Sequence, residues 1–296
     1  MSATQPLFAF FGTPRFAVRV LDALEVNGLL PALVVTAPDK PAGRGLELRP
    51  SPAKVWALER GIDVMTPATL RDEAFVAELA NTEWDVFAVA AYAKLIPKNI
   101  LDIPRVGALN VHPSLLPKFR GPSPALSAIL ADERTTGVTI MQVVEKMDAG
   151  PVVAQARIEL EEDHPDAPAG AGWPPKGSLF EDLLATEGGN LLAEVLPGWV
   201  AGEVAPEPQT ESAATYTRKF TDQDALVDLT GDSREQLLKI RAFDKNPRAY
   251  FVQDGKRIIV TEAEVKEGQL EILKVIPEGK KETDFKTYLA GRGARP

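Results

Sequence analysis

Strand-like and helix-like segments alternate from residue 7 to residue 160, and this alternation constrains the fold more than any other feature of the chain. Leu7–Phe11 is a short apolar run typical of a buried strand, and after the turn Gly12-Thr13-Pro14 the apolar residues recur at helical spacing. Further strands are predicted at 32–36, 64–65, 86–90, 106–112, 138–144 and 152–160. Helices are predicted at 52–60, with Ser51 as its N-cap, at 72–81, capped by Asp72, and at 124–129 and 179–195. This pattern predicts an α/β fold with a Rossmann-like, mostly parallel sheet that the last strands close antiparallel at one edge.

Two irregular stretches divide the rest of the chain. Residues 161–177 are rich in proline and glycine and predict a surface insertion, whereas residues 198–215 predict an interdomain linker. Beyond the linker, Ser233 and Gln236 form a capping-box pattern that predicts a helix to residue 243. Asp254-Gly255 then predicts a hairpin, and a further strand is expected at 270–276. We therefore expect a catalytic domain at 1–197, a linker at 198–215 and a small helix-plus-β domain at 216–296.

The residue types present exclude several kinds of chemistry. The chain has no cysteine, so it holds no disulfide scaffold, no thiolate nucleophile and no cysteine-ligated metal. Its two histidines are too few for a multi-histidine site, and we expect no bound metal. The turn Gly12-Thr13-Pro14 lacks two of the three glycines of a dinucleotide-binding loop, which disfavours a nicotinamide- or flavin-dependent dehydrogenase.

The N-terminus and the net charge bear on location and partners. The first residues carry no basic leader and the apolar run at 7–11 is too short to cross a membrane, so we expect a cytoplasmic protein with no membrane contact. A net charge of −9 disfavours indiscriminate binding of nucleic acid. Residues 215–296 carry a small positive balance, which fits either a polyanionic partner or an ordinary solvated face.

Two polar side chains stand at the end of a predicted strand. Residues two apart on a strand face the same side, so Asn110 and His112 share one face while Val111 packs the other way. Ligands of open α/β sheets bind beyond the carboxyl ends of the strands, where this pair lies. Asp148, in the turn after 138–144, is the best candidate to orient the imidazole, although Asp-Ala-Gly is also a common turn. An oxyanion-stabilising amide, a proton-moving imidazole and a supporting carboxylate suit acyl or formyl transfer.

Several motifs together resemble those of one enzyme family. They are Phe11-Gly12-Thr13-Pro14, Pro38-Asp39-Lys40-Pro41-Ala42-Gly43-Arg44-Gly45, Asn110-Val111-His112-Pro113-Ser114-Leu115-Leu116-Pro117, Arg120-Gly121, Gly137-Val138-Thr139-Ile140-Met141-Gln142 and Asp148-Ala149-Gly150. The block from Asn110 to Pro117, with Asp148 downstream, resembles the folate-dependent formyltransferases. The loop 38–45 resembles the methionyl-tRNA formyltransferases among them. The likeness covers residues 7–160 closely and resumes at 178–192, 217–248 and 277–281.

The resemblance implies a reaction and a set of site residues. The reaction is transfer of the formyl group of 10-formyltetrahydrofolate to the α-amino group of methionine on initiator tRNA, as needed for translation initiation. Asn110, His112 and Asp148 are the implied catalytic residues. The implied folate-binding residues are Ser114, Leu115, Leu116, Pro117, Ala91, Tyr92, Ala93 and Ile96. In the family the loop matching 38–50 enters the tRNA acceptor end, so Lys40, Arg44 and Arg49 are expected to contact tRNA; the alternative is a plain proline-rich turn.

The chain also departs from the family. Gly121-Pro122-Ser123-Pro124 stands where Gly-Ala-Ala-Pro is usual, and residues 216–296 suffice only for a shortened OB-like tRNA-binding domain in a protein expected to be a monomer. The first alternative is a nucleotide-sugar N-formyltransferase, which would share the catalytic trio but not the loop 38–50. A non-catalytic RNA-binding relative is disfavoured by the intact trio. A 10-formyltetrahydrofolate hydrolase would leave the C-terminal segment without a purpose.

Overall fold

The computed structural model describes residues 5–42, 46–160 and 173–293. The chain divides into two compact units. The first unit consists of Met1–Gly121, Gly137–Ile158 and Glu181–Tyr216, and the second of Pro122–Thr136, Glu159–Phe180 and Thr217–Pro296. Most of the predicted insertion at 161–177 lies outside the described residues. Within the described part of the chain, no helix is long and apolar enough to span a membrane.

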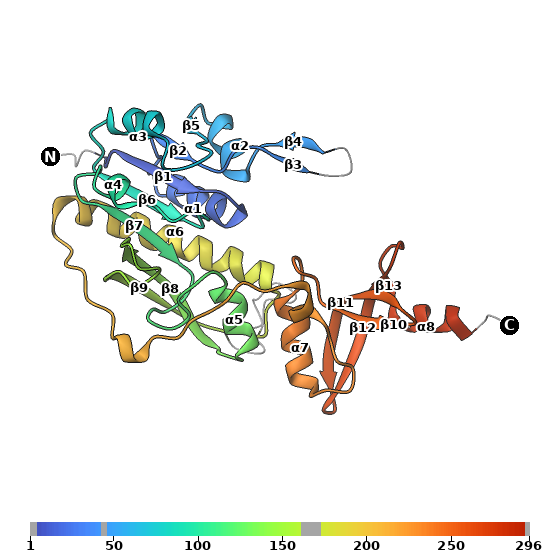
Figure 1. The fold of residues 1–296 in the computed structure, drawn as a ribbon. Helices are drawn as coiled ribbons and strands as arrows, with labels where there is room; N and C mark the ends of the chain where they lie inside the picture. The colour runs from blue at the N-terminus through green and yellow to red at the C-terminus, as the bar shows by residue number, and fades with distance from the viewer. Residues whose placement is uncertain (1–4, 43–45, 161–172, 294–296) are drawn as a thin grey trace. The chain divides into compact units, whose positions relative to one another are not determined.

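A seven-stranded sheet runs through the first unit, with the strand order β5-β2-β1-β6-β7-β8-β9 (Figure 1). Its strands are β1 (Phe8–Gly12), β2 (Leu33–Val35), β5 (Asp63–Met65), β6 (Val86–Ala90), β7 (Ala108–His112), β8 (Thr135–Gln142) and β9 (Val152–Glu159). The pairs from β5 to β7 are parallel, whereas β7 and β8 are antiparallel. The prediction of a mostly parallel sheet with an antiparallel edge is therefore confirmed.

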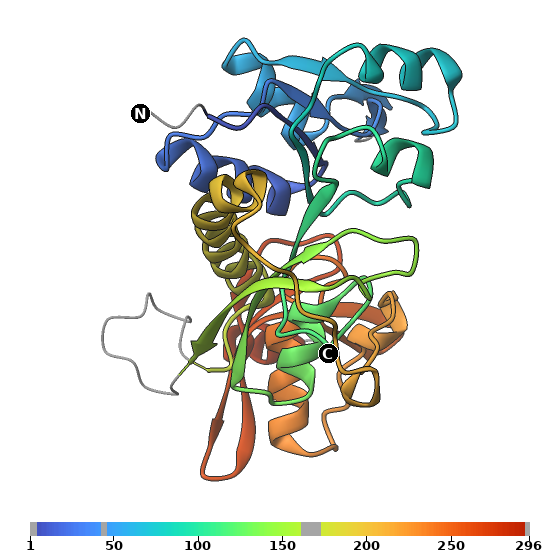
Figure 2. The same ribbon diagram turned by 90° about the vertical axis from the view of Figure 1, so that its left-hand side faces the viewer.

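Alternate residues of the central strands enter two separate apolar cores, as the period of two requires. In β1, Phe8 and Phe10 join one core, and Ala9 and Phe11 join the other. Helices α1 (Arg15–Val26), α2 (Pro52–Glu59) and α6 (Gly177–Ala201) contribute to the first core, and α3 (Glu73–Ala80) and α4 (Lys98–Leu101) to the second. Figure 2 shows α6 along one side of the sheet. Both faces of this part of the sheet are thus covered, which explains why β1, β2 and β6 are almost wholly apolar.

The helix starts follow local capping rules. The Ser51 hydroxyl accepts a hydrogen bond from the Lys54 N–H at 3.1 Å, and the Asp72 carboxylate accepts one from the Ala74 N–H at 3.0 Å. Such caps each contribute about 1 kcal/mol to helix stability. The predicted caps of α2 and α3 are therefore confirmed, while α6 is longer than predicted because it continues through Pro197 to Ala201.

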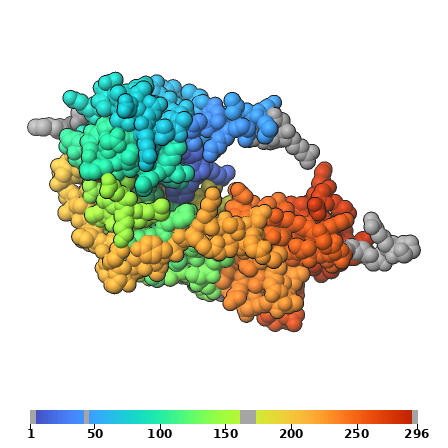
Figure 3. All heavy atoms as spheres, viewed as in Figure 1, coloured from blue at the N-terminus to red at the C-terminus, as the bar shows by residue number. Residues whose placement is uncertain are grey.

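The stretch 38–52 was predicted to be a loop, and this prediction is wrong for its central part. It contains an antiparallel ribbon of β3 (Lys40–Ala42) and β4 (Glu47–Arg49), in which Lys40 is paired with Arg49. The ribbon projects from the body of its unit (Figures 1 and 3). Pro41 is compatible with it because a two-stranded ribbon has two edges, where a missing N–H is tolerated.

The second unit holds a four-stranded antiparallel sheet with the order β10-β11-β12-β13. Its elements are α5 (Pro124–Leu130), α7 (Ser233–Ala242), β10 (Tyr250–Gln253), β11 (Lys256–Lys266), β12 (Gln269–Pro277), β13 (Thr283–Asp284) and α8 (Phe285–Gly293); two 3-10 turns, η1 (Glu211–Ala213) and η2 (Asp222–Ala225), precede α7 along the chain. The predicted hairpin is confirmed, because Asp254 and Gly255 both take the positive φ values that a tight turn of this kind requires.

The start of α7 differs from the prediction. The helix is capped by Asp232, whose carboxylate accepts a hydrogen bond from the Glu235 N–H at 2.9 Å. The Ser233 hydroxyl instead accepts from the Leu270 N–H of β12, and the Gln236 side chain accepts from the Asp228 N–H. The predicted capping box is therefore wrong, because both of its side chains are used in contacts with other segments of the unit.

Candidate active site

The strand β7 places Asn110 and His112 on one side, as its alternation predicts. Leu109 and Val111 lie in the first apolar core, so the two polar residues point to the opposite face of the sheet. Asn110 is half-buried, whereas His112 is only 4% exposed. The sheet therefore holds the imidazole firmly at the carboxyl end of its strand and leaves the amide partly accessible.

The contacts of His112 define its protonation state. Its Nε2 lies 3.0 Å from the carbonyl oxygen of Phe119, and because a carbonyl only accepts, Nε2 carries the proton of this hydrogen bond. Nδ1 lies 3.8 Å from the Asp148 Oδ1. Burial lowers the pKa of His112 below its ordinary value of 6.5, although the Asp148 charge and the Phe119 carbonyl act in the other direction. At neutral pH the imidazole is therefore uncharged, with the Nδ1 lone pair on the side of the carboxylate.

The backbone around Asp148 is unusual and explains how its carboxylate reaches His112. Asp148 adopts a φ of 50°, and its Oδ2 accepts a hydrogen bond from the Gly121 N–H at 2.8 Å. At Gly150 a β-carbon would lie 1.7 Å from the Gln142 carbonyl oxygen, so only glycine fits. The turn Asp148-Ala149-Gly150 thus has a fixed shape, and it brings together the imidazole and carboxylate singled out in the sequence.

The predicted folate residues fall into two environments. Ser114 and Leu116 are buried; the Ser114 hydroxyl donates to the Lys118 carbonyl at 2.7 Å, and the Leu116 N–H donates to the Thr139 hydroxyl at 3.1 Å. These bonds shape the turn after β7, and Leu115 and Pro117 remain half-buried. Direct contact of this turn with a folate stays a prediction.

The second predicted group follows β6. Ala91 and Ala93 are exposed, Ile96 is buried in the second core, and the Tyr92 ring packs edge-on against Phe11 with 5.6 Å between ring centroids. The Tyr92 hydroxyl is buried and has no hydrogen-bond partner among the described residues. Burial raises the pKa of Tyr92 to about 12, so this hydroxyl is a permanent donor.

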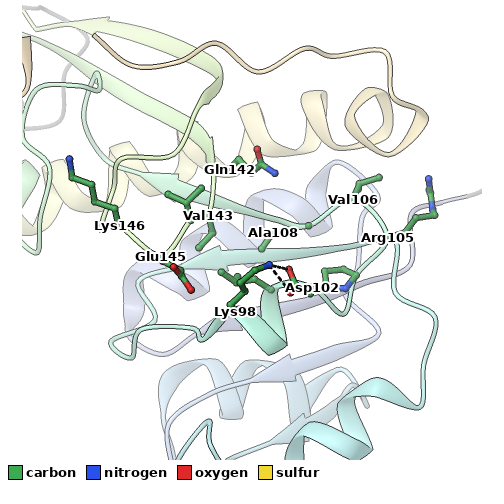
Figure 4. A pocket seen from close by; sticks show the side chains of 13 residues that line it. Lys98, Asp102, Arg105, Val106, Ala108, Gln142, Val143, Glu145 and Lys146 are labelled. Atoms are coloured by element: carbon green, nitrogen blue, oxygen red, sulfur yellow. Dashed lines mark hydrogen bonds and ion pairs between the residues drawn. The ribbon is translucent and has the colours of Figure 1, made fainter. Parts of the chain in front are cut away.

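A cavity of about 860 Å³ lies near the start of β7 (Figure 4). Its apolar wall includes Leu101, Val106, Ala108, Val143 and Val144, and a pair of Lys98 and Asp102, 2.7 Å apart, lies at its polar side. None of the predicted folate residues lines it. The sequence analysis did not predict this cavity. The only trace of it in the sequence is the apolar end of the predicted strand 138–144, which was assigned to the sheet alone.

Two of the three residues predicted to contact tRNA lie on the β3–β4 ribbon. Lys40 and Arg49 are paired across it, while Arg44 lies outside the described residues. Burial of Lys94 and the nearby charge of Lys40 lower the pKa of Lys94, which indicates a local excess of positive charge. Among the described residues, no three His, Asp or Glu side chains are grouped so that they could hold a metal ion.

Comparison with known proteins places this site in a class. A family model described as formyl transferase matches residues 6–167 of the chain. The methionyl-tRNA formyltransferase of Chloroflexus aggregans is 42% identical over 86% of this chain and 79% of its own length. That of Methylococcus capsulatus is 35% identical over 95% of both chains.

Solved structures share the fold. A methionyl-tRNA formyltransferase from Clostridium thermocellum has a TM-score of 0.60 at 14% identity, covering 93% of this chain and 99% of its own. An N-formyltransferase from Helicobacter canadensis, solved with folinic acid and dTDP-3-aminofucose, also has a TM-score of 0.60, at 17% identity over 90% of this chain and 95% of its own. The family model, which matches more than half of the chain, thus defines a formyltransferase, and the solved structures share its fold. With relatives 42% and 35% identical over most of its length, the chain belongs to the methionyl-tRNA formyltransferase family.

Proposed function

We propose that this enzyme transfers the formyl group of 10-formyltetrahydrofolate to the α-amino group of methionine on initiator tRNA. The observation that carries the proposal is the arrangement of an accessible amide, Asn110, beside a buried neutral imidazole, His112, whose Nδ1 lies 3.8 Å from the Asp148 carboxylate. This arrangement suits the attack of an amine on a formyl carbon. The product, N-formylmethionyl-tRNA, serves translation initiation, which places the enzyme in the cytoplasm.

The proposed reaction needs modest proton chemistry. A free α-amino group has a pKa of about 7.7–8.0, so a sizeable fraction is neutral near pH 7. Its nitrogen attacks the formyl carbon, and the formyl oxygen gains negative charge that the Asn110 amide N–H groups stabilise. The bond from the formyl carbon to N10 of the folate then breaks. The nitrogen of methionine loses one proton and N10 gains one, so no net proton is released.

His112 is the proposed carrier of that proton. Its Nδ1 holds the free lone pair, because Nε2 donates to Phe119. Protonation at Nδ1 creates an imidazolium, and the Asp148 carboxylate, 3.8 Å from Nδ1, stabilises its charge. Because burial lowers the pKa of His112, release of the proton to N10 is favoured.

The donor is proposed to lie along the loop from Val143 to Asp148. The cavity of Figure 4 offers apolar walls for a flat ring system next to this loop, and the Tyr92 hydroxyl offers an unused hydrogen-bond donor after β6. The turn 114–117 and the segment 91–96 remain the other proposed contacts. A ligand that fits all of these residues has a ring with an apolar face and polar edges.

The tRNA acceptor is proposed to contact two places. The β3–β4 ribbon presents Lys40 and Arg49, whose charges can pair with phosphates of the acceptor end. Residues 216–296 form the proposed second contact through their antiparallel sheet. The N-formyltransferase from Helicobacter canadensis, solved with dTDP-3-aminofucose, has the same TM-score as the methionyl-tRNA formyltransferase from Clostridium thermocellum, so the fold does not discriminate between acceptors.

The deciding experiment offers the purified chain 10-formyltetrahydrofolate together with either Met-tRNA or a UDP-amino sugar. Formylation of Met-tRNA, measured as acid-precipitable formyl label, is expected, and the sugar should remain unmodified. Formylation of the sugar alone would replace the proposal with a nucleotide-sugar N-formyltransferase. Formate release without either acceptor would identify a hydrolase.

A further inference from the structure

We propose that Gln209 is a positioning residue that holds the Asp148 turn in its reactive shape. This inference rests on the proposed function, because the turn matters only if Asp148 supports His112. Gln209 lies in the stretch 198–215, which the sequence indicated only as a linker.

The side chain of Gln209 uses all of its hydrogen-bonding capacity at this site. Its Nε2 donates to the Asp148 carbonyl at 2.9 Å and to the Gly150 carbonyl at 2.7 Å. Its Oε1 accepts from Arg120, at 3.0 Å from Nε and 2.9 Å from Nη2. An amide has two N–H groups and two oxygen lone pairs, so every position is filled.

The Asp148 turn needs such support because its backbone is strained. The φ of 50° at Asp148 lies in the left-handed region, which favours glycine and which other residues adopt less readily, so the turn depends on contacts that hold it. The two carbonyls that Gln209 binds flank the turn on both sides of Ala149. Because Gln209 donates to both carbonyls, it fixes the direction of the turn. The direction of the turn in turn sets the position of the Asp148 carboxylate relative to His112.

The same stretch also fixes the other partner of His112. The Phe119 N–H donates to the Thr215 hydroxyl at 2.8 Å, and the Arg120 N–H donates to the Thr215 carbonyl at 2.9 Å. Phe119 has a φ of 59°, and its carbonyl accepts the proton of His112 Nε2. Residues 209–215 therefore hold both strained segments that contact the imidazole.

Arg120 provides the anchor of Gln209. Its side chain is 1% exposed and is also bonded to Glu211 at 2.9 Å. Hydrogen bonds from Lys146 and Arg120 lower the pKa of Glu211 to about 2, so the ion pair persists across the working pH range. The support of the turn is therefore permanent and does not itself respond to pH.

The chemistry of the site explains why glutamine is needed. Glutamate at this position would accept from Arg120 but has no N–H for the two carbonyls. Asparagine is one methylene shorter and cannot reach both ends at once. Methionine has the length of glutamine and makes none of the four hydrogen bonds.

The test compares Gln209→Met and the milder Gln209→Asn with the wild-type full-length chain. The first readout is the NMR titration of the His112 imidazole, assigned in a His164→Gln background because the chain has only two histidines. Because the Asp148 charge raises the pKa of His112, loosening the turn is expected to lower that pKa further. Gln253→Met, the same change at a half-buried glutamine of β10, is the control and should leave the titration unchanged.

The second readout is steady-state formylation of Met-tRNA. We expect kcat to fall about ten- to a hundredfold in Gln209→Met, with a smaller loss in Gln209→Asn and KM for the folate donor within twofold of wild type. If a Gln209 variant folds and its His112 has the same pKa as in wild type, the inference is overturned, whatever the melting temperature of that variant. Wild-type chain that formylates nothing would instead defeat the proposed function, and the titration would still decide the role of Gln209.

Discussion

Replacing Asp148 with asparagine isolates the charge of the carboxylate from its shape. The asparagine oxygen can still accept the hydrogen bond from the Gly121 N–H, which holds the side chain in place at 2.8 Å in the wild type. What disappears is the attraction between the carboxylate and an imidazolium whose Nδ1 lies 3.8 Å away. At an effective dielectric constant of 20, two unit charges at that distance attract each other by about 4 kcal/mol.

That energy sets the expected loss of rate. Since about 1.4 kcal/mol corresponds to a factor of ten in rate, Asp148→Asn should lower kcat by about a hundred- to a thousandfold. The loss falls on kcat because the charge on His112 exists only after the reaction has begun. Binding of folinic acid, measured by calorimetry, should stay within about threefold of wild type.

A matched control guards against a general effect of removing a carboxylate. Asp182 of α6 lies in the same unit and is 20% exposed, against 15% for Asp148, and it pairs with Arg15. Asp182→Asn should retain the wild-type kcat. A kcat within threefold of wild type for Asp148→Asn, or an equal loss in Asp182→Asn, would refute the role of the carboxylate.

Three further predictions follow from the site. Because burial lowers the pKa of His112, the folded state binds fewer protons than the unfolded chain, so this contribution to stability is complete above about pH 6.5 and is lost as the pH falls below it. The melting temperature of His112→Asn should therefore fall less than that of wild type between pH 7.5 and pH 5, and parallel curves would contradict this. Gly150→Ala should lower the free energy of unfolding by about 1–3 kcal/mol and remove most of the turnover, because its β-carbon would meet the Gln142 carbonyl; Gly291→Ala in α8, where nothing lies within 4 Å of the added carbon, serves as control, and equal shifts in melting temperature would argue against the clash. Lys40→Ala and Arg49→Ala should raise KM for Met-tRNA several-fold and weaken its dependence on salt without changing donor affinity, whereas an unchanged KM would remove the ribbon from the acceptor site.

Local sequence patterns were sufficient for several features of both units. The caps Ser51 and Asp72, the turn at Asp254-Gly255 and the alternation along β7 all depend on residues within a few positions of one another. Such features form because of local hydrogen bonding and the period of the backbone, so the same residues produce them in any fold. The presence of Asn110 and His112 on one side of a strand end was predictable for this reason.

Other outcomes depended on segments far apart in the chain. The Ser233 hydroxyl was predicted to cap α7, but it bonds β12 because that strand packs beside the start of the helix. The ribbon at 40–49 arose in a proline-rich stretch with no alternating apolar pattern. Val143 and Val144, directly after β8, line a cavity, although the apolar pattern of 138–144 indicated only a strand.

The sequence by itself determined the mostly parallel sheet and the place of Asn110 and His112 on one side of β7, since these follow from periodicity. Only the tertiary structure decided how the proposed catalytic residues, Asn110, His112 and Asp148, are held. Asp148 reaches His112 through a left-handed turn fixed by Gln209, which is 61 residues away in sequence, and Arg120 is bound by residues 89 and 91 positions further along. Hydrogen bonds of this kind leave no periodic trace, because they depend on which distant segments the packing of the sheet and helices brings together.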